Sequence, residues 1–199
     1  MDPSDHSWVA PIISDMVLYF SEKVHNYKVR FLLEDTKMWK KIKPYIKTFI
    51  VGIAIPIGVG LLSAFLTKDN MDIYDELIVP ALAPPGWLFP VAWTILYAIM
   101  GISSAMIYLR RGSEPTAVRE SLTSYGISLV INFAWSILFF NANAFLLSFV
   151  WLVLLFYFII KTIIGYYRID KRAAYLQIPY ALWVAFAGYL NISIYFLNS

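Results

Sequence analysis

The chain has 199 residues with a formal net charge of +3, and 60% of its residues are hydrophobic, which gives a mean hydropathy of +0.65. This composition is too apolar for an ordinary soluble domain and predicts a membrane protein with several spans. The absence of cysteine excludes disulfides and thiolate chemistry, and mild positive charge spread between apolar segments does not predict a nucleic-acid partner.

Residues 1–47 form a polar, basic stretch before the first long apolar segment. Between residues 13 and 39, apolar side chains recur at helical spacing with charged side chains on the other face, which predicts an amphipathic extension. The acidic opening resembles neither a signal peptide nor a mitochondrial presequence, so we expect insertion through the first internal span. Two interpretations of the extension stay open: it lies on an anionic membrane surface, or it docks a partner.

Five apolar segments follow, and each is long enough to cross the hydrocarbon core as a helix. They lie near residues 48–66, 87–109, 122–140, 144–164 and 174–197. The predicted fold is therefore an all-α membrane protein with a five-helix bundle over residues 48–199. Lys and Arg gather in the extension and in alternate connections, which predicts an N-terminus inside and a C-terminus outside.

Small residues suggest where the predicted spans approach each other closely. In the first span, Pro56 predicts a bend, and nearby glycines leave room for a neighbouring helix. These glycines are Gly52, Gly58 and Gly60. In the second span, Gly101 and Ala105 form a small-xxx-small pair, which marks close packing either within one chain or between two chains of a dimer.

The connection over residues 67–86 is long and acidic, with four carboxylates and one lysine. Connections of this length often serve as lids, which is the role we expect here. Pro84 and Pro85 stand at its end, where proline suits the entry to a helix. Trp87 follows at the level of the membrane interface, where an amphipathic ring is favoured.

The spans contain no central Asp, Glu, Arg or His, which argues against a proton-coupled pump or a charged channel filter. Both histidines, His6 and His25, lie in the extension, so no metal site is expected. Asn132 is the most informative polar residue, because an unpaired amide in hydrocarbon is costly. It either bonds to another helix or anchors a ligand.

Trp93 and Trp183 lie too deep in their spans to belong to an interfacial belt. Trp183 shares a helix face with the small residue Ala187, and Tyr97 follows one turn after Trp93. These residues suit either ordinary core packing or the walls and recess of a site for a flat apolar ligand.

Three stretches of the chain together form a family pattern. The first includes Pro84, Pro85, Trp87, Trp93, Leu96 and Tyr97. The second is Asn132-Phe-Ala-Trp135, and the third is Pro179-Tyr-Ala-Leu-Trp183-Val-Ala-Phe-Ala187. They lie in the expected order on separate spans and resemble the TspO/MBR family of translocator proteins over roughly residues 48–198. Three features depart from the family pattern: Leu82 replaces a tryptophan, Ala92 replaces the valine before Trp93, and the extension has no counterpart in short members.

The resemblance implies a pocket that binds planar hydrophobic molecules, with porphyrins or haem first and sterols or benzodiazepine-type compounds second. It implies ligands rather than cofactors, and the matching pocket residues are Trp93, Tyr97, Asn132, Trp183 and Ala187. Pro56, Pro84, Pro85, Trp87 and Pro179 are expected to be structural. A homodimer is also implied, because the family often dimerises.

Two alternatives to ligand binding or transport stay open. One is light-dependent porphyrin degradation through the pocket tryptophans, since no acid–base pair predicts ordinary catalysis. The other is a membrane-anchored interaction or stress-regulatory protein. A sterol-recognition pattern fails at the end of the last span but occurs around Tyr157 and Tyr27. The expected membrane is the plasma membrane in a prokaryote, or the mitochondrial outer membrane or secretory pathway in a eukaryote.

Overall fold

The computed structural model describes residues 22–23, 40, 42–71 and 73–199. Contacts divide the chain into Met1–Ile46 and Lys47–Ser199. The predicted amphipathic extension falls almost wholly outside the described residues, and its role stays a prediction. The second unit contains the membrane helices except for the first residues of the first span.

Within the described residues, five helices are long and apolar enough to cross a membrane, which confirms the predicted all-α, five-helix membrane fold. The first span is Ile42–Asn70. It is followed by α3 (Leu88–Leu109), α4 (Pro115–Ser136) with the π-helical turn η2 (Ile137–Asn141), α5 (Phe145–Ile169) and α6 (Lys171–Leu197). The end of the first span is the 3₁₀ turn η1 (Lys68–Asn70), and the short helix α2 (Ile73–Glu76) lies in the connection to α3. The orientation in the membrane stays a prediction.

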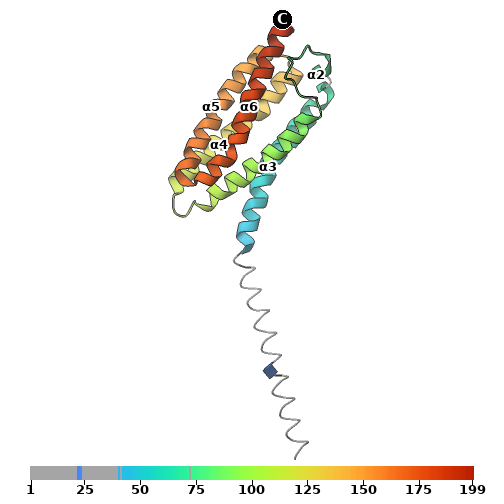
Figure 1. Ribbon diagram of the computed structural model, residues 1–199. Coiled ribbons are helices and arrows are strands. Elements are labelled where there is room, and N and C mark those ends of the chain that lie inside the picture. The colour runs from blue at the N-terminus through green and yellow to red at the C-terminus, as the bar shows by residue number, and fades with distance from the viewer. Residues whose placement is uncertain (1–21, 24–39, 41, 72) are drawn as a thin grey trace, which may run out of the picture. The chain divides into compact units, whose positions relative to one another are not determined.

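Helices α3, α4, α5 and α6 pack around one apolar core, with α5 against α4 and α6, and α3 against α6 and α4 (Figure 1). Fully buried side chains at its centre include Met100, Ile107, Leu155, Ile159 and Tyr166. The long apolar outer faces of the helices remain exposed, as expected where lipid replaces water.

The first span lies beside α3 and crosses it at two small residues (Figure 1). A Cβ added at Gly101 would lie 2.5 Å from the Cα of Ile53 and 2.7 Å from the carbonyl oxygen of Gly52. A Cβ added at Gly52 would lie 3.0 Å from the Cβ of Ala105. The small pair on α3 therefore packs the first span within the same chain, and the predicted homodimer does not rest on it.

Further along the first span, a Cβ added at Gly60 would collide with the Tyr97 ring, whereas one at Gly58 would meet nothing within 4 Å. Only two of the three glycines expected to permit close approach therefore do so. Pro56 is buried, one turn after Gly52 and one turn before Gly60. This face of the first span is the one that packs on α3.

The connection between the first span and α3 is tied to two helix ends. At one point, the Asn70 amide donates to the Asn141 side chain over 3.0 Å, and Asn141 donates to the carbonyl oxygen of Leu66 over 3.0 Å. At the other, the Asn198 side chain accepts from the N–H of Ile78 and donates to its carbonyl oxygen. The connection with α2 thus lies at the end of the bundle where the chain terminates (Figure 1).

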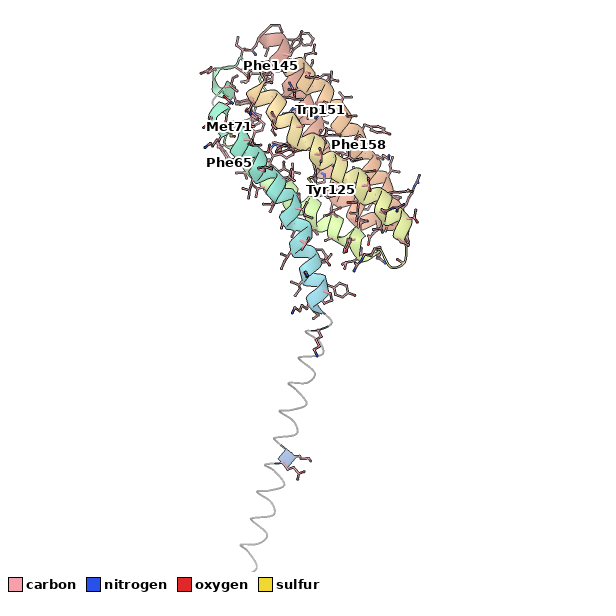
Figure 2. The ribbon with its side chains drawn as sticks, turned by 180° about the vertical axis from the view of Figure 1, so that it is seen from behind. Phe65, Met71, Tyr125, Phe145, Trp151 and Phe158 are labelled. Carbon is pink, nitrogen blue, oxygen red and sulfur yellow. The ribbon has the colours of Figure 1, made fainter. Side chains whose placement is uncertain are left out.

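Figure 2 shows this arrangement from behind. Phe65 and Met71 lie toward the same end of the bundle as Phe145, the first residue of α5, whereas Tyr125 lies toward the other end. The connection therefore covers one end of the helices only.

A single residue, Asp170, separates α5 from α6. Its carboxylate accepts a hydrogen bond from the N–H of Arg172 over 3.0 Å, which caps the first turn of α6. The same carboxylate lies 3.2 Å from the guanidinium of Arg110, the C-terminal cap of α3. Burial alone would raise the pKa of Asp170, but the hydrogen bonds from Arg172 and Arg110 outweigh it and hold the pKa below its usual value.

We expect Asp170→Ala to lower the free energy of unfolding by about 1 kcal/mol, because it removes the cap. Asp170→Asn, which keeps an N-cap side chain, should lower the free energy of unfolding by less than Asp170→Ala does. Since the folded pKa is depressed, the carboxylate contributes fully above the unfolded pKa of about 3.9, and its contribution falls as the pH drops through the folded value. Thermal unfolding in detergent at neutral and acidic pH checks this. Equal destabilisation by both variants would contradict the capping role.

Candidate ligand-binding site

A cavity of about 540 Å³ lies between the first span, α3, α4 with η2, and α6. Its volume falls in the range of small-molecule sites, about 300–1,000 Å³. The end of the first span and the connection close one side, where Met71 contributes to the lining (Figure 2). The lining combines aromatic, small and polar side chains, among them Gly60, Ser63, Ala64, Thr67, Met71, Tyr74, Trp87, Phe89, Trp93, Tyr97, Trp135, Ser136, Phe139, Phe140, Ala187 and Asn191.

Aromatic rings from α3, α4 and η2 form most of one wall. Trp93 stacks on Tyr97 with ring centroids 5.5 Å apart and an interplanar angle of 29°. Trp135 lies 6.3 Å from Trp93 and 5.6 Å from Phe139, each at a tilted angle. The structure thus brings the predicted residues Trp93 and Tyr97 together at the cavity, next to a tryptophan that was not predicted from the sequence to belong to the site.

Asn132 is buried behind this wall and is not part of the lining. Its amide oxygen accepts a hydrogen bond of 2.8 Å from the Tyr97 hydroxyl, and its amide nitrogen donates over 3.2 Å to the Tyr180 hydroxyl. One side chain therefore joins α3, α4 and α6. Of the two interpretations that the sequence left open, the structure supplies the interhelical hydrogen bond, and it places Asn132 one side chain away from the cavity.

Trp183 also stands outside the lining. Its ring meets Trp93 edge-on, with centroids 6.4 Å apart and an interplanar angle of 87°, and it contacts Phe89 at 6.1 Å. Its indole nitrogen is buried without a hydrogen-bond partner in the described part of the chain. Trp183 therefore supports the Trp93 ring from behind, whereas Ala187, one turn later on α6, lines the cavity as expected from its small size.

Asn191 is a buried polar residue of the lining that was not predicted from the sequence to belong to the site. Its amide accepts from the indole N–H of Trp135 over 3.3 Å and donates to the carbonyl oxygen of Phe145 over 2.9 Å. It thus holds the cavity face of α4 against α6 and the start of α5. The signal for it in the sequence is its position one turn after Ala187, on the same face of α6.

The π-helical turn η2 forms part of the cavity lining. Phe139 and Phe140 meet edge-on with centroids 5.0 Å apart, and both line the cavity. Such turns are often found at functional sites, because they shift the side chains that come after them relative to a regular helix. Nothing in the composition of Ile137–Asn141 distinguishes it from an ordinary apolar helix end.

The residues that were predicted to be structural lie in different parts of the molecule, some in the connection before α3 and one inside α6. Pro84 and Pro85 lie in the connection before α3, and the carbonyl oxygen of Pro84 accepts from the Tyr74 hydroxyl over 3.3 Å. Trp87, directly before α3, is 67% exposed and borders the cavity. Pro179 lies inside α6 on an exposed face, where lipid is expected.

Within the described residues, five helices apolar enough to cross a membrane, four of which border an aromatic cavity, define an integral membrane protein. Residues 52–197 match the TspO/MBR family. The chain is 38% identical over 148 residues to Tryptophan-rich protein TspO of Chlorobaculum tepidum, which covers 74% of this chain and 92% of that protein. It is 34% identical over 125 residues to Protein CrtK of Rhodobacter capsulatus, covering 63% and 78% of the two chains. It is 33% identical over 139 residues to the Translocator protein of Sus scrofa, covering 67% and 82%.

The chain therefore belongs to the TspO/MBR family, as its three motifs suggested. Membership and the relatives support a ligand-binding or regulatory role in a membrane. Among the described residues, no cluster of His, Cys, Asp and Glu has the arrangement of a metal site.

Proposed function

We propose that the protein binds planar hydrophobic molecules in the cavity between the first span, α3, α4 and α6. Porphyrins are the first choice, and sterols and benzodiazepine-type compounds are the second. The observation that carries the proposal is the stacked pair Trp93 and Tyr97, which presents flat aromatic surface to an apolar cavity of about 540 Å³. Aromatic faces of this kind favour flat, polarisable ligands.

The chemistry of the lining favours a metal-free ring over haem. Haem iron is held by histidine, thiolate, methionine or tyrosine. The lining contains neither histidine nor cysteine, and the Tyr97 hydroxyl is already engaged by Asn132. Met71 at the edge and Tyr74 are the remaining side chains of those types. A metal-free porphyrin needs none of them.

The rigid setting of the aromatic wall also supports binding. Tyr97 is fixed by Asn132, and Trp135 is fixed by Asn191, so both rings are held before a ligand arrives. A site that is ordered in advance loses less conformational entropy on binding. The connection over residues 67–86 is tied down at Asn141 and Asn198, and we propose that it acts as the lid.

Quenching of tryptophan fluorescence by protoporphyrin IX in the dark tests the site. Ala187→Leu adds a larger side chain directly into the cavity, and we expect it to weaken saturable quenching at least about tenfold by occluding the site. Ala185→Leu is the matched control, because Ala185 lies on the same helix, is exposed and is not part of the lining. It should bind as the wild type does.

The control separates specific binding from partitioning into the micelle. Quenching that is linear in ligand and equal in all three proteins would contradict the proposed function. Equal weakening by both leucine variants would also contradict it, since the effect would then not come from the cavity.

A further inference from the structure

The end of the bundle opposite to the C-terminus is basic. The α3–α4 and α5–α6 connections meet there, because the Arg110 guanidinium lies 3.2 Å from the Asp170 carboxylate. Basic residues outnumber acidic ones in these connections and in the adjoining helix turns, with Arg110, Arg111, Arg119, Arg168, Lys171 and Arg172 against Glu114, Glu120 and Asp170. The connection over residues 67–86, at the other end, is acidic. The two ends of the bundle therefore carry opposite charge.

Three of these cations surround the start of α6. Arg168, Lys171 and Arg172 are exposed, and their side chains form no ion pair within the described residues. Asp170 lies between them in the sequence, but its carboxylate is engaged by the Arg110 guanidinium and by the N–H of Arg172. The positive charge of the three side chains is therefore available to an anion from outside the chain.

Two exposed tyrosines lie beside these cations, one from each helix. Tyr167 of α5 and Tyr175 of α6 meet edge-on, with ring centroids 6.2 Å apart and an interplanar angle of 68°. The Lys171 ammonium lies over the Tyr167 ring, 5.2 Å from its centroid. Tyrosine is favoured at the level of the lipid headgroups, because its ring is apolar and its hydroxyl is polar. The tyrosine pair therefore holds Lys171 at headgroup level.

Toward the middle of the bundle, the same helix faces are aliphatic and exposed. The residues one and two turns away from the tyrosines are Ile164 and Ile160 on α5, and Ile178 and Leu182 on α6. Helix α5 runs toward the connection and α6 runs away from it, and the two helices lie side by side (Figure 1). On both helices the order is thus cation, tyrosine and then aliphatic side chains, which is the order of charged headgroup, ester region and acyl chains in a phospholipid.

We propose that the α5–α6 surface site, made of Tyr167, Arg168, Lys171 and Tyr175, binds an anionic phospholipid of the surrounding bilayer. Lys171 and Arg168 attract the phosphate, the tyrosine hydroxyls donate to phosphate or ester oxygens, and the acyl chains lie along the aliphatic side chains. A zwitterionic phospholipid gains less, because its own cation neutralises its phosphate. None of these residues lines the cavity, so the inference does not depend on the proposed function.

Native mass spectrometry of the full-length protein in detergent tests the site. It measures binding of phosphatidylglycerol and of phosphatidylcholine with identical acyl chains, and we expect the anionic lipid to bind the wild type at least about tenfold more tightly. Lys171→Gln should weaken phosphatidylglycerol about fivefold, the effect of one cation at an anionic surface, and leave phosphatidylcholine within about twofold. Equal affinity of the wild type for the two lipids overturns the inference.

Lys68→Gln is the matched control for the charge. Its ammonium also lies 5.2 Å from the centroid of an exposed ring, that of Phe65, but it stands in the acidic connection at the other end of the bundle. This variant should bind both lipids as the wild type does. If Lys68→Gln and Lys171→Gln weaken phosphatidylglycerol equally, the effect comes from net charge and the site is overturned.

A second pair of variants tests the tyrosines. Tyr175→Leu keeps an apolar side chain but removes the ring and hydroxyl, and it should weaken phosphatidylglycerol at least about threefold through the lost hydrogen bond to a charged acceptor. Tyr189→Leu is the control, because Tyr189 is also exposed but lies toward the other end of α6. Equal effects of the two variants would contradict the site.

A soluble competitor distinguishes a lipid from a free phosphate ester. Glycerol 3-phosphate carries the phosphate without acyl chains, so it cannot use the aliphatic side chains of α5 and α6. At millimolar concentration it should displace no phosphatidylglycerol from the wild type. Displacement would identify a site for soluble phosphate esters and overturn the assignment to a lipid.

Discussion

Replacing Gly101 by alanine should lower the free energy of unfolding by at least about 3 kcal/mol, at the upper end for an overpacked site. The added methyl would lie 2.5 Å from the Cα of Ile53 and 2.7 Å from the Gly52 carbonyl oxygen. Both obstacles are backbone atoms, so no side-chain rotation relieves the clash, and the first span has to move away from α3. Thermal unfolding in detergent measures the loss.

Gly58→Ala is the matched control for Gly101→Ala. It lies on the first span, and an added methyl there would meet nothing within 4 Å. Because alanine is the better helix former, this variant should be neutral or more stable by up to about 1 kcal/mol. A Gly101→Ala protein as stable as Gly58→Ala would show that the first span and α3 do not cross closely at Gly101.

Asn132→Leu should destabilise the bundle by about 2–4 kcal/mol, because it leaves the hydroxyls of Tyr97 and Tyr180 buried without their partner. Interhelical hydrogen bonds in membranes contribute only about 0.6 kcal/mol on average. Most of the loss of stability should therefore come from the two buried tyrosine hydroxyls that are left without a hydrogen-bond partner. Freed from Asn132, the Tyr97 ring can leave its stack on Trp93, and ligand affinity should fall as well.

The triple variant Asn132→Leu, Tyr97→Phe, Tyr180→Phe separates these effects. It removes both partners of each hydrogen bond and keeps the rings, so stability should return to within about 1 kcal/mol of the wild type. If the loss of affinity in Asn132→Leu comes only from the hydroxyls left without a partner, ligand affinity should recover with stability. Recovery of stability without recovery of affinity would show that the hydrogen bond from Tyr97 to Asn132 is needed to hold the ring in its stack on Trp93.

The number and order of the helices follow from the sequence, because each span is an unbroken apolar segment, and charge, proline or the asparagines Asn141 and Asn143 separate it from the next. The sequence predicts the ends of the helices less well than their number and order. Helix α4 begins at Pro115, well before the apolar segment expected near residue 122, since its first turns carry Arg119 and Glu120. Proline at the first helical position marks the start of α4, and a hydropathy profile does not detect this signal.

The site was less accessible to sequence reasoning than the fold. The positions of Trp93, Tyr97 and Ala187 follow from motif and helix spacing, and all three line the cavity. For Asn132, the sequence shows that the amide needs partners but not which ones. Those partners, Tyr97 and Tyr180, lie 35 and 48 residues away, and only the crossing of three helices brings them together.

The small pair on α3 illustrates the same limit. Spacing shows that Gly101 and Ala105 share a face, and that face suits either a neighbouring span or a second chain. The choice depends on where the first span lies, which the connection over residues 67–86 determines through its bonds to Asn141 and Asn198.

The first span has few buried side chains, and this affects the order in which the protein assembles. Only 11% of its most apolar stretch is buried, compared with 44% for α3 and α6. Its main contacts, at Gly52 and Gly60, are to α3, and its end bonds to Asn141 beyond α4. It leaves the ribosome before any of these partners, so it must wait in lipid until they are synthesised. We expect the helix that enters the membrane first to be the last to join the bundle, and the cavity to be completed only at that step.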